Sequence, residues 1–269
     1  MARNRVRTAR IASLLALTAA LALLTGCGGE DAAGPAAHKG AGHRPAVVVT
    51  TTWEGAFAKA AGAEDVTVIV PRSVHHAPDY DPKPSDLAAV ARADFVLYAP
   101  FEPYAAKIKE AAGSKARLVE VNLDNEPARA SAEITRLGGL FGTKGAAERF
   151  TARLDGEVAR LNGELESAWP GGKSPVVVTQ VFTGWAAGLA GATTVGTYGP
   201  EPVTPARLAA LSARKPALVL DNAHMSTGTV LPDVAAKQVE VVNYPGEDLD
   251  LLAVYRDAAA AMKKAMGGA

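Results

Sequence analysis

The sequence predicts an α/β protein with two lobes, each a mainly parallel four-stranded sheet flanked by helices. Two observations support this fold class. Short β-branched runs alternate with Ala-rich, helix-compatible segments over residues 46–125 and again over residues 171–269. These runs are almost continuously apolar, as strands buried on both faces of a parallel sheet are. Between the two series, residues 126–170 hold no credible strand and predict a long connecting helix.

The expected elements alternate along each lobe. First-lobe strands are expected at Val47–Thr51, Val66–Val70, Phe95–Ala99 and Leu118–Asn122. First-lobe helices are expected at Trp53–Ala61, Ser85–Arg92 and Glu102–Ala112. Second-lobe strands are expected at Val176–Thr179, Thr193–Thr197, Leu218–Leu220 and Val239–Asn243. Second-lobe helices are expected near Gly184–Ala190, Thr204–Ala213, Val230–Lys237 and Leu249–Met266.

The connecting segment has apolar residues at helical spacing among Arg and Glu. Glycines between Gly138 and Gly145 interrupt this pattern. One long helix is the prediction for residues 126–170, and two helices broken near these glycines are the alternative that the sequence leaves open.

The N-terminus predicts export. Arg3, Arg5, Arg7 and Arg10 precede the apolar run Ile11–Leu24, which is too short to span a bilayer stably. Removing residues 1–26 as a signal peptide takes away these four arginines and no acids, which leaves a formal charge of −4. An acidic mature chain argues against nucleic acid as a partner.

The segment Leu24-Thr25-Gly26-Cys27 resembles the lipobox of bacterial lipoproteins, in which cleavage before the cysteine frees the thiol for lipidation. Cys27 is the only cysteine in the chain, so neither a disulfide framework nor a cysteine metal site is expected. Residues 27–45 are rich in Gly, Ala and Pro and predict a flexible tether. We therefore expect a monomer that a lipid on Cys27 anchors to the outer face of the cytoplasmic membrane.

Candidate ligands lie in the loops that follow the predicted strands. In open α/β sheets, ligands bind beyond the carboxyl ends of the strands. The first-lobe loops carry His75, His76 and Glu102, and a second-lobe loop carries Asp221 and His224. Imidazole nitrogens and carboxylate oxygens are ligands of zinc, which points to a metal site. Each residue also has a structural alternative, such as an acid in the first turn of a helix or a loop cap.

The clearest family resemblance lies in the loop that follows the second predicted strand. Asp79-Tyr80, followed by Pro84-Ser85-Asp86, resembles the first metal loop of the zinc and manganese receptors of bacterial ABC importers. The resemblance implies a two-lobed receptor that binds one divalent ion between its lobes and delivers it to an ABC permease. Such a receptor performs no chemical step, so we do not expect an enzyme.

The chain departs from this family at the usual ligand positions. Pro78 stands where the first histidine ligand is expected, and proline cannot bind a metal. The second family histidine has no counterpart near Asn122-Leu123-Asp124. Gln180 stands at the third position, and Asn243-Tyr244 aligns loosely with the late aspartate.

Adjacent loops offer replacements for these ligands. The prediction is that His76, Glu102 and His224 bind the ion, with His75 and Asp221 as less certain ligands. Zn²⁺ is the expected ion and Mn²⁺ the next, because nitrogen ligands favour the softer metal. Further residues expected beside the ion are Asp79, Tyr80 and Gln180.

Three alternative functions remain open from the sequence. A receptor of the same architecture for haem, a corrinoid or a ferric siderophore would need fewer protein ligands and a broader aromatic cleft. The aromatic residues available for such a cleft are Trp53, Tyr80, Tyr104 and Trp185. A zinc hydrolase with Glu102 as its base is a second alternative, although the chain has no G-x-S-x-G, P-loop or H-E-x-x-H motif. A lipoprotein that only organises the envelope is the third.

Overall fold

The computed structural model describes residues 45–74, 79–226 and 228–267. All of them fall within one compact unit, residues 42–269. The predictions for the signal peptide, the tether, lipidation of Cys27, and the ligands His75 and His76 lie outside the described residues.

Within the described ranges, no helix has both the length and the apolar character needed to cross a membrane.

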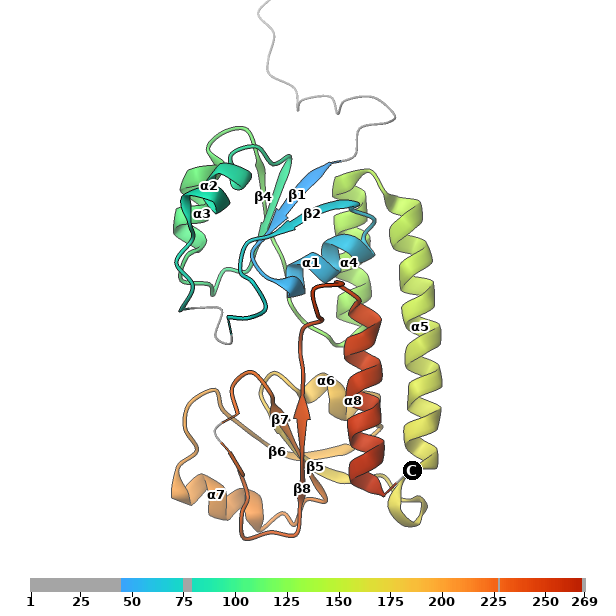
Figure 1. The fold of residues 1–269 in the computed structure, drawn as a ribbon. Helices are drawn as coiled ribbons and strands as arrows, with labels where there is room; N and C mark the ends of the chain where they lie inside the picture. The colour runs from blue at the N-terminus through green and yellow to red at the C-terminus, as the bar shows by residue number, and fades with distance from the viewer. Residues whose placement is uncertain (1–44, 75–78, 227, 268–269) are drawn as a thin grey trace, which may run out of the picture. The chain divides into compact units, whose positions relative to one another are not determined.

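The first lobe is a parallel sheet with helices between its strands (Figure 1). Its elements are β1 (Ala46–Val49), α1 (Thr52–Ala60), β2 (Asp65–Val68), α2 (Pro84–Val90), β3 (Phe95–Tyr98), α3 (Ala105–Ala112) and β4 (Arg117–Glu120). The strand order is β2-β1-β3-β4, and every neighbouring pair is parallel. All four residues of β3 are buried, as expected for a central strand covered on both faces.

The second lobe repeats this arrangement. Its elements are β5 (Val176–Gln180), α6 (Gly184–Leu189), β6 (Thr193–Tyr198), α7 (Pro205–Ser212), β7 (Leu218–Asn222), β8 (Lys237–Val241) and α8 (Leu251–Met266). The order is β6-β5-β7-β8, again parallel throughout. The predicted fold class of two parallel four-stranded sheets flanked by helices is therefore confirmed, because each expected strand is present at nearly its expected position.

The connecting segment contains two helices, α4 (Pro127–Phe141) and α5 (Lys144–Ser167), followed by the short 3-10 helix η2 (Pro170–Gly172). Helix α4 ends at Gly142, whose φ of 76° is left-handed and favours glycine. The two helices pack closely because Gly138 has no side chain; a Cβ there would lie 2.5 Å from the Ala147 Cβ. The structure thus decides between one helix and two in favour of two.

Two sequence expectations about helices are wrong. Glu102 does not open a helix: it lies in a turn before α3, because Pro103 disfavours helical backbone at the preceding residue. No helix forms over residues 230–237. There the Val230 N–H donates to Gln238 Oε1 (2.9 Å), and β8 already begins at Lys237.

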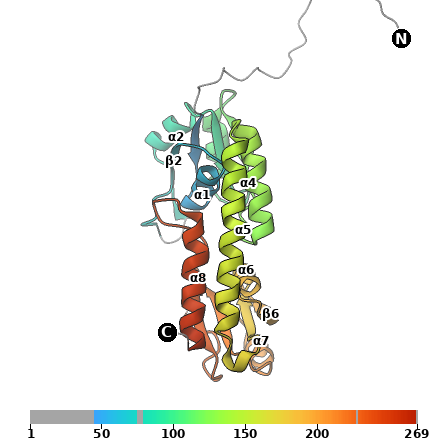
Figure 2. The ribbon, with the colours of Figure 1, turned by 90° about the vertical axis from the view of Figure 1, so that its right-hand side faces the viewer.

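One hydrophobic core extends through both lobes. It combines residues of both sheets with the buried faces of α1, α4, α5 and α8, and includes Phe57, Leu154 and Tyr255. Helices α5 and α8 lie side by side (Figure 2). Their exposed edges are joined by ion pairs, such as Arg256 with Glu157 (2.5 Å). The Arg160 and Arg256 guanidinium groups hold the pKa of Glu157 at about 2. This packing holds the two sets of strand ends in one unit.

Candidate metal-binding site

Two buried asparagines connect the loops of the two lobes. Asn125, after β4, donates through Nδ2 to the Asn243 carbonyl oxygen after β8 (2.6 Å). Trp53 Nε1 donates to Asn125 Oδ1 (3.0 Å), and Trp185 Nε1 donates to Asn243 Oδ1 (2.8 Å). The Tyr255 hydroxyl donates to the Asn125 carbonyl oxygen (2.8 Å). The Asn243 side chain therefore accepts a structural hydrogen bond.

Aromatic rings from both lobes meet beside these asparagines. The predicted ligand His224 stacks on Tyr244, with ring centroids 3.7 Å apart and an interplanar angle of 17°. Tyr244 in turn contacts Trp53 of the first lobe, at a centroid distance of 5.4 Å. The His224 backbone N–H donates to Asn222 Oδ1 (3.0 Å), which fixes the turn that carries the ring. His224 is thus positioned near the first lobe through Tyr244.

Glu102 is buried at the carboxyl end of β3 and only 6% exposed. Its Oε2 accepts from the Ala99 N–H (3.1 Å), and its Oε1 accepts from the Tyr104 hydroxyl (3.0 Å). Burial raises the pKa of Glu102 above its usual value, although both hydrogen bonds oppose this. Burial first, and the Glu102 carboxylate second, also raise the pKa of Tyr104.

A second buried acid, Glu54, lies beside Glu102 and was missed by the sequence analysis. Glu54 is fully buried in the first turn of α1. Burial first, and then the Glu102 carboxylate, raise the pKa of Glu54 to about 8. The available signal was Thr51-x-x-Glu54, a capping box that predicts a helix start and says nothing about burial.

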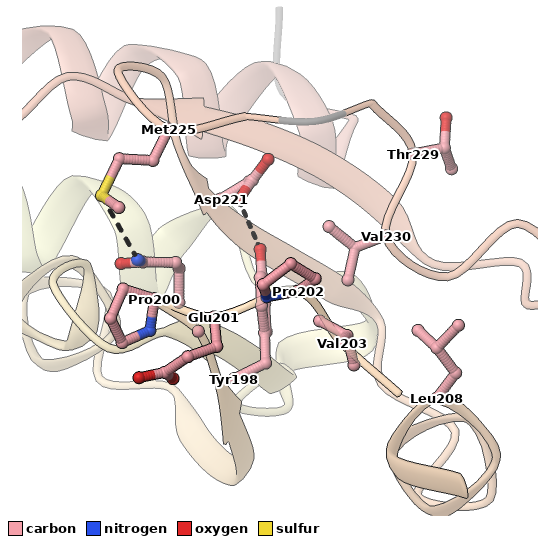
Figure 3. Close-up of a pocket in the computed structure, with 12 residues that line it drawn as sticks. Tyr198, Pro200, Glu201, Pro202, Val203, Leu208, Asp221, Met225, Thr229 and Val230 are labelled. Atoms are coloured by element: carbon pink, nitrogen blue, oxygen red, sulfur yellow. Dashed lines mark hydrogen bonds between the residues drawn. The ribbon is translucent and has the colours of Figure 1, made fainter. Parts of the chain in front are cut away.

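Asp221, a less certain predicted ligand, faces a pocket inside the second lobe (Figure 3). Its Oδ1 accepts from the Tyr198 hydroxyl (2.5 Å) and the Asn222 N–H (2.9 Å), and its Oδ2 accepts from Gln238 Nε2 (3.2 Å). The pocket has a volume of about 280 Å³. Its walls combine apolar residues such as Val203, Leu208 and Val230 with polar ones such as Glu201 and Thr229. Three donors thus already surround the Asp221 carboxylate.

The other residues expected beside the ion also make local contacts. Gln180 Oε1 accepts from the Phe182 N–H (2.6 Å), a contact within the loop that follows β5. The Tyr80 hydroxyl donates to Asp86 Oδ2 (2.7 Å), and Asp79 is exposed. Tyr80 therefore contacts the start of α2, and Gln180 contacts the loop that follows β5.

The structure brings only part of the predicted ligand set together. In the part of the chain that it describes, no three His, Cys, Asp or Glu side chains are grouped so that they could hold a metal ion. Glu102 lies with Glu54 in the first lobe, and His224 lies with Tyr244. Burial first, and the Glu54 carboxylate second, raise the pKa of Tyr244 to about 12. This interaction shows that the two groups are neighbours.

The fold of the whole chain is similar to that of several solved two-lobed proteins. Among solved structures, the laminin-binding protein Lmb of Streptococcus agalactiae, described as a bifunctional protein with adhesin and metal transporting activity, superimposes with a TM-score of 0.63 at 16% identity. That match covers 82% of this chain and 99% of the other. The Zn(II)-bound ZnuA-like domain of AdcA from Streptococcus pneumoniae gives a TM-score of 0.57 at 16% identity, over 83% and 99% of the two chains. The substrate-binding protein FpvC from P. aeruginosa, in complex with Ni²⁺, gives 0.63 at 14% identity, over 84% and 99%.

The sequence of the first lobe gives a more specific match. Residues 47–136 match the family model of ZnuA, described as zinc-uptake complex component A, periplasmic. That family is a component of an uptake complex and not an enzyme. A comparison with curated protein sequences finds no match. The family match and the structural neighbours agree with the predicted resemblance to metal receptors of ABC importers.

Proposed function

We propose that this protein is an extracytoplasmic lipoprotein that captures a divalent transition metal ion between its lobes and delivers it to an ABC permease. Zinc is the proposed ion and manganese the next. The proposed ligands are His76, Glu102 and His224, with His75 and Asp221 as weaker candidates. A lipid on Cys27 would anchor the protein to the outer face of the cytoplasmic membrane, where it would act as a monomer.

One observation carries this proposal: residues 47–136 match a zinc-uptake family in a chain whose whole fold resembles metal-bound receptors. The geometry adds support from both lobes. Glu102 is buried at the carboxyl end of β3. His224 follows β7 and reaches the first lobe through its stack on Tyr244. Both residues thus lie where open α/β sheets bind their ligands.

The ligand chemistry predicts how binding depends on pH. Histidine coordinates a metal only through neutral imidazole, so protons compete with the ion for the site. We expect affinity for zinc to fall as the pH drops through the histidine range, between about 7 and 5. Release to the permease would need no covalent chemistry, only a docking step that disturbs the ligand set.

The test is zinc titration and elemental analysis of the full-length protein, purified in detergent. We expect one equivalent of zinc in the wild type and a loss of at least tenfold in affinity, a rough figure for a lost ligand, in His76→Ala and His224→Ala. His38→Ala, in the predicted tether, is the matched control and should bind like the wild type. Wild-type affinity in the double variant His76→Ala/His224→Ala would contradict the ligand assignment.

A metal enclosed in an organic ligand is a second candidate cargo. Large apolar side chains are exposed on strand-end loops of both lobes: Phe101 is 69% exposed, Phe182 49% and Met225 40%. Haem, a corrinoid or a ferric siderophore would contact such side chains, whereas a bare ion would not. Of the aromatic residues expected to line such a cleft, Tyr104 and Trp185 are buried. A coloured, tightly bound ligand in protein that binds no zinc would favour this candidate.

A further inference from the structure

The first lobe buries two carboxyl groups at neighbouring strand ends. Glu54 lies one turn after β1, and Glu102 lies four residues after β3, the strand paired with β1. Their exposed fractions are 0% and 6%. The fully buried Thr50 hydroxyl lies beside both carboxyl groups and lowers the pKa of each. Three oxygen-bearing side chains therefore converge on one buried position.

Two buried side-chain oxygen atoms at this position have no hydrogen bond of regular geometry to a described residue. Glu54 Oε2 accepts from the Thr51 N–H (3.0 Å) and from the Thr51 hydroxyl. Both Glu102 oxygens have donors, the Ala99 N–H and the Tyr104 hydroxyl. Glu54 Oε1 and Thr50 Oγ1 are buried, yet neither makes a hydrogen bond of regular geometry to any described residue. Buried oxygens without donors are rare and call for an explanation, such as an ion.

No basic side chain balances the two acids. Within residues 45–74, 79–226 and 228–267, the ion pairs of Lys and Arg involve other acids. The other buried glutamate of this part of the chain, Glu133, behaves differently, because it pairs with Arg136 (2.5 Å). Two like charges buried without a counter-charge are unstable, and they are stabilised either by a proton or by a cation.

We propose that Glu54 and Glu102 together bind the transported cation through their carboxylate oxygens, with the Thr50 hydroxyl as a further oxygen ligand. This inference rests on the proposed function and adds Glu54 to its ligand set. The cation supplies the positive charge that the surrounding side chains lack. Tyr244 of the second lobe lies near enough to feel the Glu54 charge, so the position lies at the contact between the lobes.

The donor set defines the class of ion. Two carboxylates and a hydroxyl are hard oxygen donors, which suit Mn²⁺ better than a set of imidazoles does. Under the proposed function, His224 is a nitrogen ligand, and nitrogen donors favour the softer ion. Loss of the oxygen donors therefore reduces Mn²⁺ affinity more than Zn²⁺ affinity. Loss of His224 reduces Zn²⁺ affinity more than Mn²⁺ affinity.

The experiment measures Mn²⁺ and Zn²⁺ affinity by titration calorimetry on the full-length protein in detergent. The variants are Glu54→Gln, which keeps the shape and removes the charge, and Thr50→Val, which removes the hydroxyl. The matched control is Glu133→Gln, the same change at a buried glutamate that has an arginine partner. We expect Glu54→Gln to weaken Mn²⁺ binding by roughly tenfold or more and Zn²⁺ binding by less, with the control unchanged.

The outcomes separate this inference from the proposed function. Wild-type protein that binds Mn²⁺ or Zn²⁺, with Glu54→Gln binding Mn²⁺ equally well, would overturn the carboxylate site and leave the receptor function standing. Wild-type protein that binds neither ion would overturn both, and the acids would then share a proton. If Glu54→Gln fails to fold, as judged by circular dichroism, Thr50→Val decides: reduced Mn²⁺ affinity supports the site, and unchanged affinity overturns it.

Discussion

The strand ends of the two lobes differ in how their buried polar groups are satisfied. At the first-lobe end, Glu54 and Glu102 are buried together, and Glu54 Oε1 makes no hydrogen bond of regular geometry to any described residue. At the second-lobe end, Gln180, Asp221 and Asn243 are also buried, but each accepts from at least one donor. The sheets share one strand order, so the difference comes from the loops.

This difference shows which polar groups can still bind a ligand. A satisfied polar group stabilises the fold and has little left to offer a ligand, whereas an unsatisfied one costs free energy until a ligand arrives. In the second lobe, the Gln180 and Asn243 side chains serve the fold through hydrogen bonds to Phe182 and Trp185. The first lobe has kept acidic oxygen atoms. We therefore expect changes at Glu54 to alter metal binding and pH response, and changes at the hydrogen-bonded Asn243 and Tyr198 to alter stability.

The largest expected effect is the pH dependence of the metal-free protein. The pKa of Glu54 is raised from about 4.5 to about 8, so the folded protein holds a proton that the unfolded chain has lost. This stabilisation is full below pH 4.5 and is lost as the pH rises towards 8. Denaturant unfolding of the protein in the presence of a chelator should show a fall of several kcal/mol between pH 5 and pH 9.

Glu54→Gln serves as the comparison for that experiment. The amide cannot ionise, so most of the decline in unfolding free energy between pH 5 and pH 9 should disappear in this variant. A wild-type profile that is already flat over this range would mean that Glu54 is ionised and balanced in the folded state.

The next prediction concerns the strand ends of the second lobe, where the buried polar groups are hydrogen-bonded. Asn243→Ala removes the acceptor for Trp185 Nε1 in a site where Trp185 is only 7% exposed. Leaving a buried donor unpaired should lower the free energy of unfolding by about 2–3 kcal/mol. Asn122→Ala, an exposed asparagine just after β4, is the control and should change it by less than about 0.5 kcal/mol. Equal effects at both positions would remove the distinction between buried and exposed amides.

The smallest effect concerns Asp221. Tyr198→Phe removes one of the three donors to this carboxylate and should lower the free energy of unfolding by about 1 kcal/mol. Zinc affinity, measured on the same samples, should stay unchanged, because the tyrosine supports a wall of the second-lobe pocket and not the ion. A large loss of zinc affinity would show that the Asp221 carboxylate contributes to the metal site.

The sequence predicted the strands well, because continuous β-branched runs such as Phe95–Tyr98 have few alternatives to a buried parallel strand. It predicted helix boundaries less well where the neighbouring chain decides them. The segment 230–237 has helix-compatible residues, yet its Val230 N–H is taken by Gln238. The break between α4 and α5 depends on how closely Gly138 and Ala147 approach, which periodicity does not reveal.

For the site, the sequence identified the loops but not their pairings. Glu102 and His224 were chosen because ligating residue types follow predicted strands, and both lie at strand ends in the structure. Glu54 was not chosen, because an acid three residues after a threonine predicts a helix cap. Its burial against Glu102 depends on the neighbouring strand, almost fifty residues further along the chain.

The sequence by itself determined the two α/β lobes, the strand-end loops and the resemblance to a metal receptor, since these follow from local periodicity and short motifs. Only the tertiary structure decided which polar groups are satisfied. Asn125 meets Asn243 across 118 residues, and that contact satisfies a buried backbone carbonyl oxygen of the second lobe. Hydrogen-bond satisfaction depends on contacts between distant segments, so it appears only once both sheets and their connecting helices are packed.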